Sequence, residues 1–144
     1  MKSINILLAE DNEGDILLTT EALEEIKLVN KVDVAKNGKD ALDYLYKRGK
    51  FENATTPDLI ILDINLPLKS GHEVLEIVKQ DENLKSIPVI MLTTSSSEKD
   101  INTAYKLHAN CYITKPVEVN QFLTSILSIQ NFWINIVALP KNNH

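Results

Sequence analysis

The chain has 144 residues, of which 44% are hydrophobic and 24% charged, and its formal net charge is −5. This size suits one globular domain with one core, and an acidic balance without a Lys/Arg cluster argues against nucleic-acid binding. One cysteine, Cys111, excludes an internal disulfide and favours the reducing cytoplasm, while the first apolar run stops at Glu10, too early for a secretion signal or a membrane span.

Five short apolar runs alternate with five longer segments that have helical periodicity. In chain order, the predicted strands are Ile4–Ala9, Val32–Ala35, Leu59–Leu62, Val89–Leu92 and Cys111–Thr114, and the predicted helices are centred on residues 16–26, 41–45, 74–78, 101–107 and 119–127. The second run is the most polar and suits an edge strand, whereas the third is continuously apolar, as in a strand buried on both faces. The alternation predicts an α/β domain with a doubly wound, five-stranded parallel sheet and helices on both faces.

Reactive side chains follow four of the five predicted strands. Glu10 and Asp11 follow the first, Asp63 the third, Thr93 the fourth and Lys115 the fifth. In a doubly wound sheet, ligands bind outside the carboxyl ends of the strands, at the switch point of the strand order. With the order 2-1-3-4-5 that point lies between the first and third strands, so we expect Asp11 and Asp63 to meet there.

The chemistry of this group favours a hard cation and a phosphoryl group. Three carboxylates at one sheet edge repel one another, and Mg²⁺ prefers a few carboxylates together with waters and phosphate oxygens. Lys115 can pair with Asp63 or with a phosphoryl oxygen, and the Thr93 hydroxyl can donate to the same oxygen. The alternative is helix capping: Asp11, taken alone, fits an N-cap equally well, as do its neighbours Asn12 and Glu13. Reactive residues at four separate strand ends favour a shared binding site over helix capping.

Several motifs agree in order and spacing with one known family. They are Leu8–Asn12, Ile61–Pro67, Gly71, Val89–Ser95 and Cys111–Pro116. Together they resemble the receiver domain of two-component response regulators. Within that family, Leu92–Ser96 and Phe132–Trp133 are similar to segments of the small stand-alone regulators that serve bacterial and cyanobacterial phytochromes. The resemblance covers nearly the whole chain and implies a flavodoxin-like sheet of order 2-1-3-4-5 with five helices.

The resemblance also implies a role for each matched residue. Asp63 would accept a phosphoryl group from a sensor histidine kinase, and the narrower resemblance points to a kinase of the phytochrome type. Thr93 and Tyr112 would form a switch pair, and Lys115 would bind the phosphoryl group. Pro116 would follow a cis peptide bond, which is costly anywhere but before proline. The Mg²⁺ ligands would be Glu10 (through water), Asp11, Asp63 and the backbone carbonyl of Asn65.

Two positions depart from the family pattern. Glu10 stands where Asp is also common, and its longer arm suits a water-mediated metal contact. His108-Ala109 stands where the family often has Gly-Ala, although a left-handed residue at the end of a helix costs His more than Gly. We therefore expect His108 to loosen the end of the fourth helix.

Two other functions compete with a phosphorylation switch. A haloacid-dehalogenase-like phosphatase also uses Asp, Mg²⁺, Thr and Lys, but it carries a general acid two residues after the nucleophile, where this chain has Asn65. Its nucleophile also follows the first strand, not the third. A phosphorylation-independent pseudo-receiver usually lacks a reactive residue, and none is lacking here. We therefore predict a regulator, not an enzyme with a separate substrate, whose output is contact with other proteins.

The C-terminal segment carries more apolar residues than one core-facing helical stripe needs. Residues 1–144 are predicted to be a single receiver domain in which about 128–144 form an extended C-terminal helix and tail. The apolar segment includes Phe132, Trp133 and Ile136. It could fold back over the domain's own core, but a twofold homodimer uses its apolar surface better. It is too short for a membrane span and lacks the basic residues of an interfacial membrane helix.

Overall fold

The computed structural model describes residues 3–27, 29–93, 108–109 and 111–128. The strands in this part of the chain are β1 (Ile4–Ala9), β2 (Val29–Ala35), β3 (Leu59–Asp63), β4 (Val89–Thr93) and β5 (Cys111–Thr114). The helices are α1 (Glu13–Glu24), α2 (Gly38–Leu45), α3 (Gly71–Gln80) and α5 (Val119–Ser128), with a 3₁₀ helix η1 at Gly49–Phe51. The predicted fourth helix and the C-terminal segment lie outside the described residues.

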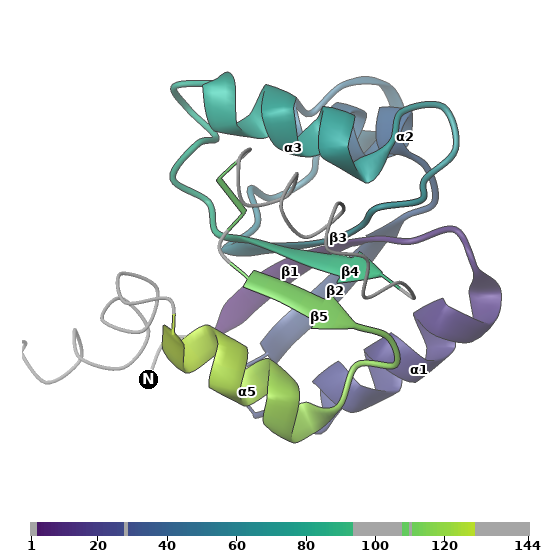
Figure 1. The fold of residues 1–144 in the computed structure, drawn as a ribbon. Helices are drawn as coiled ribbons and strands as arrows, with labels where there is room; N and C mark the ends of the chain where they lie inside the picture. The colour runs from purple at the N-terminus through teal and green to yellow at the C-terminus, as the bar shows by residue number, and fades with distance from the viewer. Residues whose placement is uncertain (1–2, 28, 94–107, 110, 129–144) are drawn as a thin grey trace, which may run out of the picture.

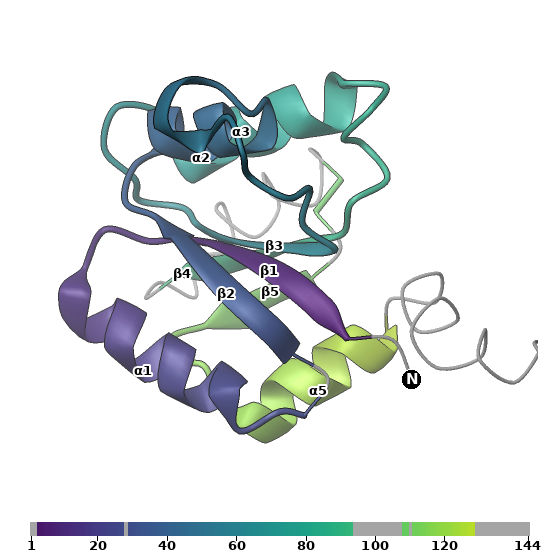
Figure 2. The same ribbon diagram turned by 180° about the vertical axis from the view of Figure 1, so that it is seen from behind.

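All neighbouring strands are parallel, and their order is β2-β1-β3-β4-β5, which confirms the predicted doubly wound sheet. Helices α1 and α5 cover one face of the sheet, and α2 and α3 cover the other (Figures 1 and 2). Leu8 of β1 lies opposite Ile61 of β3, which in turn lies opposite Ile90 of β4. No helix in the described segments is long and apolar enough to cross a membrane.

Each face of the sheet has its own hydrophobic core, because successive strand residues point to opposite faces. In β3, Leu59 and Ile61 join the cluster under α1 and α5, whereas Ile60 and Leu62 join the cluster under α2 and α3. All five β3 residues are buried, as the continuous apolar run predicted. The alternation places Asp63 on the same face as Leu59 and Ile61, toward α1.

Three local features differ from the sequence-based expectations. The edge strand β2 begins at Val29 and includes the polar residues before Val32. The helix η1 lies between the second predicted helix and the third predicted strand, where the hydrophobic pattern predicts no element. Leu17, counted among the apolar residues of the first helix, is 57% exposed, and its neighbour Leu18 is 53% exposed. Polar edge residues and solvent-facing leucines both break the simple link between hydrophobicity and burial.

Two glycines allow the helices of one face to approach the loop after β3. A Cβ on Gly71 would lie 2.2 Å from the backbone oxygen of Asp63, and a Cβ on Gly38 would lie 2.1 Å from that of Lys69. The Gly71 amide also donates to the Ile64 carbonyl at 2.8 Å, and the Gly38 amide donates to the Pro67 carbonyl at 3.1 Å. The start of α3 is thereby fixed directly against the residue that ends β3.

Candidate phosphoryl-acceptor and metal site

The carboxyl ends of β1 and β3 bring three acidic side chains together. Glu10, Asp11 and Asp63 each offer a carboxylate oxygen, and these oxygens lie within 4.8 Å of one another. We call these three residues the strand-end cluster. Glu10 and Asp63 are buried, whereas Asp11 is exposed. The cluster therefore opens to solvent on the Asp11 side, where a small ligand could enter.

Lys115 lies at the centre of the acidic group. It follows β5, and its side chain is only 9% exposed. Its ammonium is 2.7 Å from Asp63 Oδ2 and 3.0 Å from Asp15 Oδ2, and it also contacts Glu10 Oε1. A buried cation among carboxylates offsets their mutual repulsion, and an ammonium has three N–H donors with which to do so.

Backbone hydrogen bonds fix the acidic side chains in place. The Asn65 amide donates to Asp63 Oδ1 at 3.0 Å, and the Asn12 amide donates to Glu10 Oε2 at 3.1 Å. The Lys115 amide donates to the Thr93 carbonyl at 2.7 Å, which ties the end of β5 to the end of β4. The Lys115–Pro116 peptide bond is cis. The Glu10 and Asp63 carboxylates are thus each held by the turn that follows their own strand.

Burial and charge change the pKa values of two groups in the site. Burial, followed by the hydrogen bond with Asp63, raises the pKa of Glu10 to about 7, although Lys115 acts in the opposite direction. Burial alone would lower the pKa of Lys115, but its hydrogen bonds to Asp63, Glu10 and Asp15 outweigh burial and raise that pKa above its ordinary value. The ammonium therefore stays charged, and the strand-end cluster still carries an excess of negative charge.

The capping alternative holds for Asn12 and not for Asp11. Asn12 is the N-cap of α1, and its side chain accepts a hydrogen bond from the Asp15 amide at 2.9 Å. Asp11 is therefore not the capping side chain. Asp15, which the sequence analysis did not single out, lies four residues after Asp11, about one helical turn, and this spacing could have placed it near the same site.

The donor set fits a hard divalent cation. Three carboxylates with oxygens within 4.8 Å of one another, two of them buried, supply oxygen ligands, and Lys115 offsets only part of their negative charge. Asn65 lies in the turn directly after β3, with its amide on Asp63. The Asn65 carbonyl stays a predicted metal ligand. The contact of Glu10 with the metal through water also stays a prediction.

The remaining predicted residues have different outcomes. Thr93 is fully buried, and Tyr112 of β5 is half-buried against the core under α2 and α3. His108 has φ +70° and is exposed, which confirms the left-handed conformation expected there. The predicted dimer residues Phe132, Trp133 and Ile136 lie outside the described residues.

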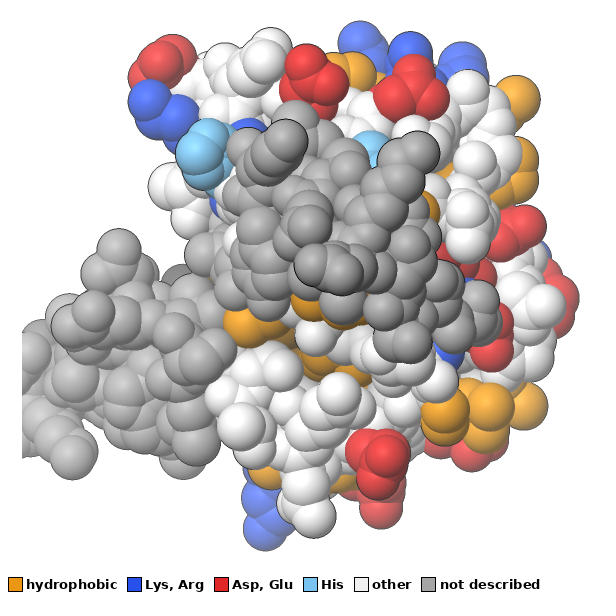
Figure 3. Space-filling view, viewed as in Figure 1, with side chains coloured by type: hydrophobic (Ala, Val, Ile, Leu, Met, Phe, Trp, Pro, Cys, Tyr) orange, Lys and Arg blue, Asp and Glu red, His pale blue; other side chains and the backbone are white. Residues whose placement is uncertain are grey.

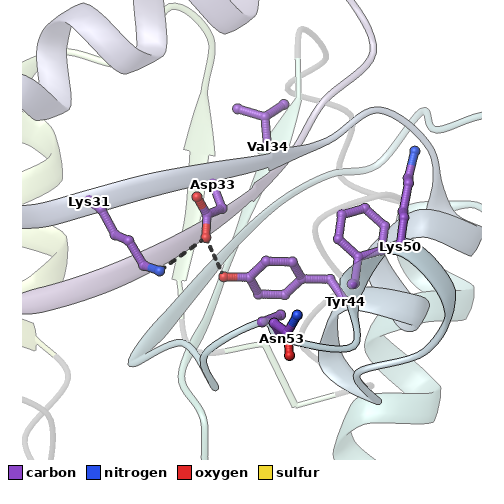
Figure 4. A pocket seen from close by; sticks show the side chains of 8 residues that line it. Lys31, Asp33, Val34, Tyr44, Lys50 and Asn53 are labelled. Atoms are coloured by element: carbon purple, nitrogen blue, oxygen red, sulfur yellow. Dashed lines mark hydrogen bonds and ion pairs between the residues drawn. The ribbon is translucent and has the colours of Figure 1, made fainter.

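Acidic side chains also gather around the cluster on the molecular surface. Figure 3 shows them on the right-hand side, toward which the strand arrows of Figure 1 point and where α1 begins. A separate hollow of about 300 Å³ lies beside β2, and none of the strand-end cluster lines it. There the Tyr44 hydroxyl donates to Asp33 at 2.6 Å, and Lys31 lies 3.5 Å from the same carboxylate (Figure 4). The Asp33 carboxylate thus has a hydrogen bond and an ion pair at the edge of the sheet.

The fold and the site agree with the comparisons to known proteins. The family model of the response regulator receiver domain matches residues 6–127, so the chain belongs to the response regulator receiver family. Phosphorylation on an aspartate and divalent metal binding are general in this family. Since Asp63 ends β3 and not β1, the haloacid-dehalogenase-like alternative is wrong.

Among its relatives, the chain is similar to the response regulator Rcp1 from Synechocystis, with 41% identity over 94% of this chain and 92% of Rcp1. The structure of the Mn²⁺-bound form of Rcp1 has a TM-score of 0.75, with 39% identity over 93% of this chain and 96% of that one. The bacteriophytochrome response regulator AtBRR has a TM-score of 0.83, with 44% identity over 92% and 96% of the two chains. The phosphorylated cyanobacterial phytochrome response regulator RcpA has a TM-score of 0.77, with 45% identity over 92% and 94%. The chain is thus a receiver of the type found in stand-alone regulators of phytochrome signalling.

Proposed function

We propose that Asp63 is the phosphoacceptor of this receiver and that a phytochrome-type histidine kinase is the donor. The observation that carries the proposal is the position of the Asp63 carboxylate: buried at the end of the central strand, 2.7 Å from the Lys115 ammonium and next to two other carboxylates. The similarity to AtBRR and RcpA, both named as phytochrome regulators, supports the choice of kinase.

The transfer is a displacement at phosphorus. An Asp63 carboxylate oxygen attacks the phosphoryl group of a phosphohistidine, a P–O bond forms, the P–N bond breaks, and its electron pair stays on the imidazole nitrogen. Lys115 has donors free to move from the carboxylates to the phosphoryl oxygens, and its raised pKa keeps it charged while it does so. The Asn65 amide holds the carboxylate in one orientation. Asp63 thus needs little rearrangement to react.

We further propose that Mg²⁺ is the metal and that Glu10, Asp11, Asp63 and the backbone carbonyl of Asn65 hold it, Glu10 through water. Bound there, Mg²⁺ supplies positive charge that offsets both the acidic cluster and the phosphoryl oxygens. The oxygen-only donor set supports this choice over softer metals.

The function is tested by incubation of the chain with Mg²⁺ and acetyl phosphate, followed by mass spectrometry. We expect one covalent phosphoryl adduct that survives acid and is lost in base, as an acyl phosphate should be, and that requires the divalent cation. A chain that stays unmodified with Mg²⁺ and a large excess of donor would contradict the proposal. Omission of Mg²⁺ and addition of a chelator provide the control.

Thr93 and Tyr112 are proposed to transmit the phosphorylation state. A phosphoryl group adds roughly −1.5 to −2 charges and strong acceptor oxygens, which would draw the Thr93 hydroxyl toward Asp63. Tyr112 would then occupy the space that Thr93 leaves, which changes the surface beside β5. We expect Thr93→Ala to accept phosphate at Asp63 but to show little change in partner binding on phosphorylation. A phosphate response equal to that of the wild type, measured by titration with the partner kinase, would contradict this role.

The C-terminal segment is proposed to form a homodimer through Phe132, Trp133 and Ile136. Such a dimer would couple assembly to phosphorylation, each favouring the other. Aromatic residues often dominate such interfaces. In sedimentation equilibrium, the wild type should be a dimer, and a Phe132→Ala, Trp133→Ala double variant should dissociate at concentrations at least tenfold higher. The matched control is Tyr46→Ala, which removes an aromatic ring from the C-cap residue of α2. A wild type that stays monomeric with and without a phosphoryl mimic would contradict the dimer.

A further inference from the structure

The Lys115 ammonium faces three carboxylates, and one of them belongs to neither the phosphoacceptor nor the metal ligands proposed above. Glu10 and Asp63 come from the strand ends, but Asp15 comes from the first turn of α1. Its Oδ2 atom is 3.0 Å from Lys115 Nζ, within hydrogen-bond distance. The contact joins residues 100 positions apart in the chain, so it results from the fold and not from local sequence.

Asp15 differs from the other two partners of Lys115 in exposure and in metal geometry. Its side chain is 29% exposed, against 4% for Asp63 and 1% for Glu10. Within the described residues, the carboxylates close enough to share one cation are Glu10, Asp11 and Asp63, without Asp15. A divalent cation in the cluster would engage these three and weaken the hold of Glu10 and Asp63 on the ammonium. Asp15 would then be the carboxylate that still attracts Lys115.

We propose that Asp15 is a positioning residue that draws the Lys115 ammonium toward α1 and competes for it with the phosphoryl oxygens. This inference rests on the proposed function of Asp63. When a phosphoryl group arrives, the donors released by Glu10 and Asp63 turn toward it, while the contact with Asp15 holds the ammonium toward α1 and away from the phosphoryl oxygens. Asp15 also adds a negative charge at the mouth of a site that must admit an anionic donor. Both effects slow the reaction, so Asp15 limits how readily Asp63 is phosphorylated.

The test compares variants that change the same charge in the same helical turn. Asp15→Asn keeps the size of the side chain but removes the charge that pairs with Lys115. Glu13→Gln is the matched control, because Glu13 is also in the first turn of α1 but pairs with Lys36 and is 73% exposed. Asp15→Glu tests rescue by a conservative change. For each chain, the rate of phosphorylation by acetyl phosphate is measured in saturating Mg²⁺, together with the affinity for beryllofluoride.

We expect Asp15→Asn to be phosphorylated about fivefold faster than the wild type and to bind beryllofluoride about fivefold more tightly, the effect of one partly exposed charge a few ångströms away. Asp15→Glu should stay close to the wild type. In about 1 M salt, where the Debye length is about 3 Å, the general charge effect should vanish from Glu13→Gln. The higher phosphorylation rate and tighter beryllofluoride binding of Asp15→Asn should persist in high salt, because the contact that this variant removes from Lys115 is direct.

Two outcomes would overturn the inference while leaving Asp63 as the phosphoacceptor. One is an Asp15→Asn chain that equals Glu13→Gln in high salt, and the other is an Asp15→Asn chain that reacts more slowly than the wild type. If the wild type takes no phosphoryl group at Asp63, the proposed function fails and this inference fails with it. Circular dichroism melting of each variant shows whether α1 has kept its fold.

Discussion

Asp63→Asn is expected to abolish phosphorylation of the chain by acetyl phosphate. The amide has the shape of the carboxylate but lacks the nucleophilic charge, so no acyl phosphate can form. The other carboxylates of the cluster have different environments: burial raises the pKa of Glu10 to about 7, and Asp11 is exposed, whereas Asp63 is buried and oriented by the Asn65 amide. Intact-mass spectrometry should show complete modification of the wild type and none of the variant.

Asp58→Asn is the matched control, because Asp58 precedes the same strand and accepts a hydrogen bond from the Asn5 amide at the opposite end of the sheet. It should be labelled like the wild type. The free energy of unfolding of the metal-free Asp63→Asn chain should equal or exceed that of the wild type. The variant removes one of two neighbouring buried carboxylate charges, those of Glu10 and Asp63. Adduct on the Asp63→Asn chain at wild-type levels would place the reactive carboxylate elsewhere.

Lys115→Met is expected to lower the free energy of unfolding of the metal-free protein by about 3 kcal/mol, at the low end of what removal of one partner from a buried ion pair costs. Methionine fills a similar volume without charge and leaves the Glu10 and Asp63 carboxylates buried without their cation. Urea denaturation in a chelator measures the loss. Addition of Mg²⁺ should restore part of it, because the ion binds the native cluster and supplies the missing positive charge.

The size of that loss should depend on pH. Glu10 has a folded-state pKa of about 7, above its ordinary value of 4.5, so at pH 5 it carries a proton in the folded protein and needs the ammonium less. The effect of Lys115→Met should therefore be smaller at pH 5 than at pH 8. Lys36→Met is the control, because Lys36 pairs with Glu13 at the surface, where such pairs contribute about 0–1 kcal/mol. Equal losses for the two variants would show that the Lys115 contacts do not stabilise the fold.

The strands and the reactive residues at their ends could be predicted from the sequence because both depend on short, local patterns. The run Leu59–Leu62 is apolar throughout, and Asp63 ends it abruptly. Parallel strands then place all of their carboxyl ends at one edge, so the sheet order alone brings Asp63 to Glu10 and Asp11. The first half of β2 escaped prediction, because an edge strand with one solvated side can be polar.

Contacts made across the sheet could not be predicted in the same way. The spacing of Asp15 from Asp11 places Asp15 near the site, but its pairing with Lys115 depends on how α1 lies relative to the end of β5, which the sequence pattern does not specify. Gly38 lies close to the Lys69 backbone, where a Cβ would lie 2.1 Å from its oxygen, and this contact joins two distant parts of the chain. Leu17 fits a helical stripe but is exposed. In each case tertiary packing decided the environment of the residue.

The segment between η1 and β3 enters the sheet at the end opposite to Asp63. Since β3 has five residues and each spans about 3.3 Å, Thr55 lies on the order of 15 Å or more along the chain from the phosphoacceptor. Thr55 is exposed, and the native Cys111 is buried, so a Thr55→Cys chain offers one thiol that reagents reach readily. A fluorescent probe attached there would lie outside the reactive pocket, so the labelled chain should still accept a phosphoryl group at Asp63.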